Sequence, residues 1–128
     1  MSYDLFVAPA TVGEDDLWDA CSDTRGYDTG IESYGDPDTG AYFNYTYNLG
    51  RFLTAYKVNP IRDLDGLTAK ECAHRIDTAL RDIEQEDQGM LADLYNPANN
   101  WGSVAGATNW LRVLRRYCLD HPLYLVRE

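Results

Sequence analysis

The sequence has few cysteines and histidines, and the cysteines are far apart from one another. Three cysteines and two histidines occur among 128 residues, without a Cys-x-x-Cys or His-x-x-x-His pair. An odd cysteine count without close spacing argues against a disulfide framework and against a zinc knuckle. We therefore expect no metal site, no cofactor and a reducing compartment, of which the cytoplasm is the usual case.

Long hydrophobic runs are also missing. No apolar stretch approaches the roughly 20 residues that are needed to span a bilayer. The first residues, MSYDLFVAPATVGEDD, lack the basic lead and the apolar core of a secretory signal. The sequence therefore predicts a cytoplasmic protein without contact to a membrane.

Basic residues are nearly absent from the first 49 positions. Residues 1–49 hold ten acids and one base, which gives −9, whereas residues 50–128 hold eleven acids and ten bases, which gives −1. Direct binding to nucleic acid needs a basic face to neutralise phosphates, so it is not expected. An acidic segment suits a basic partner, or it simply keeps the protein in solution.

The length and composition that remain are ordinary for one globular domain. Hydrophobic residues make up 45% of the chain and charged residues 25%, and a chain of this length can bury a core without a metal or disulfide. We predict a single domain over 1–128. A long acidic loop is expected at about 23–40, where Gly and Asp dominate and no periodicity is present.

Alternating apolar residues predict short strands over 3–8, 41–48 and 123–128. Long helices are predicted over 68–83, where Thr68 and Glu71 form a capping box, and over 103–120. Shorter helices are predicted over 13–23, 51–58 and 90–95. Cys72 and Cys118 fall on the apolar faces of the long helices. The expected fold is α+β, with two long amphipathic helices packed on one face of a small antiparallel sheet.

The triplet Asp-Thr-Gly occurs twice, at 28–30 and 38–40. An aspartic protease needs two such triplets on symmetric loops after apolar strands, and here both lie in one glycine-rich loop. A calcium loop that began at Asp36 would need a glutamate where Tyr47 stands. Turn chemistry, in which Asp caps its own backbone and Gly supplies positive φ, explains both copies.

Two polar and aromatic motifs remain as candidates for ligand binding. They are NYTYN at 44–48 and NPANNWGS at 96–103, and the second leads into a helix N-terminus. The alternative is a helix connection, with Asn in turns and Trp101 stapling the next helix. The ligand would be a nucleotide, with Arg51 or an arginine of the last helix on its phosphate. The candidate residues are Asn44, Tyr45, Tyr47, Asn99, Asn100, Trp101 and Ser103.

Together with GLTAKECAHRI in the middle of the chain, these motifs resemble a family of small proteins from bacteriophages and their high-GC actinobacterial hosts. The resemblance covers about 42–118, and the acidic insertion at roughly 14–40 departs from the family pattern. It implies a phage or mobile-element accessory protein acting in the cytoplasm of a bacterial host. It assigns no reaction and no catalytic residue.

The function that these observations favour is a non-enzymatic acidic protein that blocks a basic surface of a host or defence protein. No nucleophile with a base and no metal constellation is recognisable, so an enzyme is not expected. A toxin-immunity protein would have the same physical profile, and a sponge for a nucleotide signal is the other alternative. Oligomeric state is left open, a homo-oligomer included. The partner-binding residues are predicted to be Asp15, Asp16, Asp19, Tyr27, Asp28, Glu32, Tyr34, Asp36 and Asp38.

Overall fold

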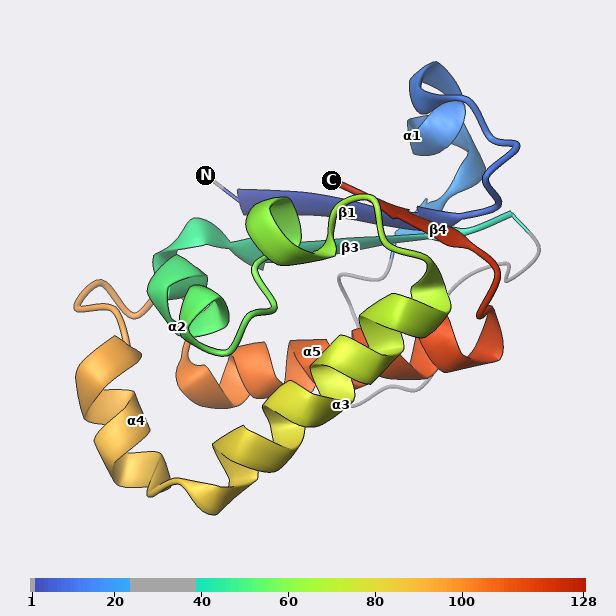
Figure 1. The fold of residues 1–128 in the computed structure, drawn as a ribbon. Coiled ribbons are helices and arrows are strands. Elements are labelled where there is room, and N and C mark those ends of the chain that lie inside the picture. The colour runs from blue at the N-terminus through green and yellow to red at the C-terminus, as the bar shows by residue number, and fades with distance from the viewer. Residues whose placement is uncertain (1, 24–38) are drawn as a thin grey trace.

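A four-stranded sheet forms the centre of the protein, seen in a computed structural model that describes residues 2–23 and 39–128 (Figure 1). Strand β1 (Ser2–Ala8) lies between β3 (Ala41–Thr46) and β4 (Leu125–Arg127) and is antiparallel to both. Strand β2 (Ser22–Asp23) adds two residues parallel to β3 at the edge. The strand order is therefore β2-β3-β1-β4.

The alternation of side chains along β1 and β3 gives the sheet two different faces. Tyr3, Leu5 and Val7 of β1 point into the main core, where they meet Phe43 and Tyr45 of β3. The intervening residues point to the other face, where the apolar ones form a small second cluster with Leu17. Its members are Phe6, Ala8, Leu17 and Tyr42.

Two long helices, α3 (Ala69–Gln85) and α5 (Val104–Asp120), cover the main core (Figure 1). The capping box predicted at Thr68 is present, because Thr68 and Glu71 each accept the backbone N–H of the other. Cys72 and Cys118 are fully buried, as predicted. The α+β fold and the placement of both long helices on one face are confirmed.

Shorter elements complete the core on one side. Helices α2 (Gly50–Ala55) and α4 (Gln88–Tyr95) lie close to where the sequence predicts them. A π-helical turn at Pro60–Leu64 was not expected. Within the described residues, no helix is both long enough and apolar enough to cross a membrane.

Several predicted boundaries are wrong. The last strand begins at Leu125 and not at 123, and α2 ends at Ala55 and not at 58. The helix expected over 13–23 is only a 3-10 turn at Glu14–Asp16 followed by α1 (Leu17–Ala20), because a run of acids offers little apolar surface to bury. The strand expected over 41–48 ends at Thr46, whose side chain accepts the N–H of Asn48 and begins a 3-10 turn at Tyr47–Leu49. Most of the loop predicted at about 23–40 lies outside the described residues.

Candidate functional site

The acidic segment from Glu14 to Asp19 stands off the sheet face that is opposite to α3 and α5 (Figure 1). Asp15, Asp16 and Asp19 are exposed. In the part of the chain that the structure describes, none of the three forms an ion pair. Three predicted partner-binding residues therefore share one projecting, uncompensated acidic surface.

This acidic surface is anchored to the sheet by packing and hydrogen bonds. The ring of Trp18 lies 4.9 Å, centroid to centroid, from the rings of both Phe6 and Tyr42, although the Trp18 side chain is 61% exposed. Arg127 of β4 donates hydrogen bonds to the carbonyls of Val12 at 2.7 Å and Pro9 at 3.2 Å. Packing and hydrogen bonds thus hold the acids in place and leave an aromatic surface beside them.

Some acids of the long helix α3 are compensated by arginines, whereas others on its exposed side, such as Asp82, form no ion pair in the described part of the chain. Asp77 on α3 pairs with Arg81 at 2.8 Å and with Arg115 of α5 at 3.0 Å. Glu84 pairs with Arg112 at 3.3 Å. The basic residues of the second half of the chain are thus partly used within α3 and α5, far from the segment that carries most of the negative charge.

The remaining predicted partner-binding residues lie outside the described residues, so the structure places none of them. They are Tyr27, Asp28, Glu32, Tyr34, Asp36 and Asp38.

The two polar motifs that the sequence singled out lie together. The Tyr45 hydroxyl donates to the carbonyl of Ser103 at 3.1 Å and accepts its N–H at 3.2 Å. Asn48 donates to the carbonyl of Trp101 at 3.3 Å. A Cβ on Gly102 would lie 2.6 Å from a methyl group of Thr46. The motifs therefore form a close-fitting joint between the end of β3 and the turn before α5.

The candidate ligand-binding residues do not all face one site. Asn44 points to the other sheet face, where it donates to the Ser2 hydroxyl at 2.8 Å. Asn99 accepts the N–H of Trp101 at 3.0 Å, which is ordinary turn chemistry. Asn100 is exposed with φ of 62°. Trp101 is 70% exposed, so its ring does not act as the expected staple.

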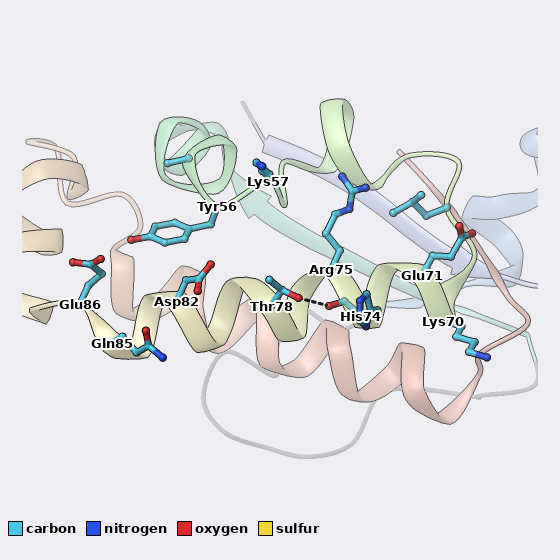
Figure 2. A pocket seen from close by; sticks show the side chains of 12 residues that line it. Tyr56, Lys57, Lys70, Glu71, His74, Arg75, Thr78, Asp82, Gln85 and Glu86 are labelled. Carbon is cyan, nitrogen blue, oxygen red and sulfur yellow. Dashed lines mark hydrogen bonds between the residues drawn. The ribbon is translucent and has the colours of Figure 1, made fainter.

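A long groove runs along the outer side of α3, facing the end of α2 (Figure 2). Its volume is about 1120 Å³. Lys70 and Arg75 line it together with Glu71, Asp82 and Glu86, all on or directly after α3. Because its wall holds both acids and bases, the groove as a whole favours no single sign of ligand charge.

A second cleft, of about 740 Å³, has a different lining. Arg51 of α2 and Arg62 of the π-helical turn line it beside the rings of Tyr3, Tyr47 and Tyr95. No carboxylate of the described residues is part of its wall. Of these residues the sequence singles out only Tyr47 and Arg51, because segments far apart in the chain build the cleft.

The thiols of Cys21 and Cys118 are not activated. Burial raises the pKa of Cys21 to about 11, although nearby Arg127 opposes this. A hydrogen bond with Cys72, together with burial, raises the pKa of Cys118 well above its ordinary value. Both thiols therefore stay protonated at neutral pH, a state in which cysteine is a poor nucleophile. Among residues 2–23 and 39–128, no three acids, histidines or cysteines gather where they could hold a metal ion.

Comparison with protein-family models, with curated proteins and with solved structures finds no match to this chain.

Proposed function

We propose that this protein is a non-enzymatic binding protein that docks its acidic N-terminal surface on a basic surface of another protein. The observation that carries the proposal is the exposed, unpaired set Asp15, Asp16 and Asp19 on a segment anchored to the sheet. Like charges held together in this way attract a basic partner over several ångströms and raise its association rate.

Trp18 supplies the second part of the interface. Aromatic residues contribute much of the binding energy at protein interfaces, whereas exposed charges mainly govern association rate. Trp18 is 61% exposed directly beside Asp19 and is held by Phe6 and Tyr42. A partner that meets the acids would also cover this ring.

The resemblance of the sequence motifs to small phage and actinobacterial proteins suggests the partner's class. A phage or mobile-element accessory protein of this kind would block a host or defence protein in the bacterial cytoplasm. If that partner is a nuclease, the acids would take the place of phosphates. An immunity protein would bind a toxin through the same surface, and the identity of the partner separates these versions.

The test is differential capture from a bacterial lysate at low ionic strength, with each captured protein identified by mass spectrometry. The bait proteins are the wild type, the triple variant Asp15→Asn/Asp16→Asn/Asp19→Asn, and a control triple variant. The control, Asp82→Asn/Glu86→Gln/Asp93→Asn, removes the same charge from exposed acids that form no ion pair in the described structure.

We expect a basic protein that the wild type and the control capture and that the acidic triple variant loses. Trp18→Ala should weaken capture of the same protein. Equal capture by all three baits would contradict the proposal, since total charge and position of charge would then make no difference.

The nucleotide-sponge alternative receives less support at the joint between the end of β3 and the turn before α5. The polar groups of Tyr45, Asn48 and Ser103 are already bonded to one another or to the neighbouring backbone. They explain the joint before α5 without a ligand.

A further inference from the structure

The cleft beside the start of β1 is unusual for a protein with net charge −10, because two arginines and no described carboxylate line it. Its volume of about 740 Å³ lies within the range of roughly 300–1,000 Å³ that is typical of small-molecule sites. Residues of β1, the turn at Tyr47–Leu49, α2, the π-helical turn and the end of α4 contribute to its wall.

Asn59 fixes the direction of the hydrogen bonds at the base of this cleft. Its Oδ1 accepts the backbone N–H groups of Ile61 at 3.0 Å and Arg62 at 3.2 Å. Because an N–H can only donate, the orientation of the amide is determined. Its Nδ2 therefore donates to the hydroxyl oxygens of Tyr3 at 3.1 Å and Thr54 at 3.0 Å.

Both hydroxyl groups consequently keep their own proton for another acceptor. Tyr3 and Thr54 line the cleft, and within the described residues neither hydroxyl has a second hydrogen-bond partner. Tyr3 is only 4% exposed. Burial raises the pKa of the Tyr3 phenol, and the hydrogen bond from Asn59 opposes this only in part. Tyr3 is therefore a nearly buried donor that stays protonated at neutral pH.

The two arginines add charge to this set of donors. Neither Arg51 nor Arg62 forms an ion pair in the described part of the chain. The guanidinium carbon of Arg51 lies 5.7 Å from the ring centroid of Tyr95, which keeps that side chain at the cleft. Two acids lie near this set of donors. Asp63 accepts the N–H of Asn59 and lies 4.0 Å from Arg75, and the charge of Glu128 adds to the raised pKa of Tyr3, although Glu128 does not line the cleft.

We propose that this cleft binds the phosphate group of a small phosphorylated molecule. Arg51, Arg62 and the hydroxyls of Tyr3 and Thr54 would donate to the phosphate oxygens, which can only accept. The rings of Tyr47 and Tyr95 would contact a flat group attached to the phosphate, as in a nucleotide. This inference goes beyond the proposed function and does not rest on the acidic surface.

The test is isothermal titration calorimetry of the full chain at low ionic strength with adenosine monophosphate, adenosine and inorganic phosphate. We expect saturable binding of adenosine monophosphate, with both adenosine and inorganic phosphate binding at least several-fold more weakly. Arg51→Gln and Arg62→Gln should each lower the affinity roughly tenfold, because each removes a charge-assisted contact. Tyr3→Phe should lower it several-fold.

Arg81→Gln is the matched control, because it is the same substitution at an exposed arginine on α3, away from the cleft. It should leave the affinity unchanged, and circular dichroism of every variant checks that the fold is kept. Absence of saturable binding to adenosine monophosphate would overturn the proposal, as would equal affinity in Arg51→Gln, Arg62→Gln and the wild type. If inorganic phosphate binds as tightly as adenosine monophosphate, the result would contradict the proposed contact of Tyr47 and Tyr95 with the flat group of the ligand.

Discussion

Individual residues explain why the two motifs that the sequence singled out come together. Tyr45 bonds the backbone of Ser103 in both directions, and Asn48 reaches the carbonyl of Trp101. Gly102 sits between them with φ of 89° and with no room for a side chain. The sequence indicates that both motifs are special, but only the fold reveals that each is the other's partner.

Replacing Gly102 by Ala should destabilise the protein by about 2–3 kcal/mol, since left-handed strain and a steric clash add together. Gly66 is the matched control, because its φ is 88° and nothing lies within 4 Å of the Cβ position. Gly66→Ala should cost only about 1–2 kcal/mol, from the strain alone. Urea unfolding measures both, and equal losses would contradict the close fit at the joint.

Elements with strong local signals are predicted well from the sequence. Helix α3 begins where Thr68 and Glu71 form the capping box, and α5 begins after Ser103, whose side chain accepts the N–H of Gly106. The helix predicted over 13–23 is mostly absent. The acids of this region favour the start of a helix but supply too few apolar contacts to extend it. The π-helical turn is missed because the buried side chain of Asn59 organises it, and local periodicity does not reveal such burial.

Of the candidate sites, the cleft is the hardest to predict from the sequence. Tyr3, Asn59 and Tyr95 are far apart in the chain. The local sequence around each of them indicates only a core or turn residue. The available signals are Tyr47 and Arg51, which the sequence indicates as candidates for ligand binding without showing that they line the same cleft.

The hydrogen bonds at the start of α3 predict how the stability of the fold depends on pH. Hydrogen bonds from the backbone and side chain of Thr68 lower the pKa of Glu71. A lowered pKa means that the carboxylate stabilises the fold above its ordinary pKa and that this contribution is lost as the pH falls through the lowered value. Glu71→Gln, which keeps an acceptor, should be less stable than the wild type at neutral pH.

That difference should shrink in acid, when Glu71 itself becomes neutral. Urea unfolding of both proteins at neutral pH and below the pKa of Glu71 provides the measurement. Glu84→Gln is a control on the same helix, whose exposed pair with Arg112 should contribute little. A difference between Glu71→Gln and the wild type that does not change with pH would contradict the role of the charge.

At the scale of the whole molecule, the acidic N-terminal segment and the main core lie on opposite sides of the sheet. The acids of η1 and α1, the 3-10 turn at Glu14–Asp16 and the helix at Leu17–Ala20, lie on one side of the sheet, while α3 and α5 cover the other side (Figure 1). Substitutions in the acidic segment should therefore change association with a partner and leave the main core intact. This separation makes the acidic surface testable by itself.

The most direct test of the central claim is the rate at which the captured partner associates with the wild type and with Asp15→Asn/Asp16→Asn/Asp19→Asn. We predict that the wild-type rate falls about tenfold or more when ionic strength rises from about 0.01 M to about 0.15 M. The triple variant should associate more slowly at low salt and depend less on salt. Equal rates and equal salt dependence in the two proteins would contradict the account, because the exposed acids would then have no part in finding the partner.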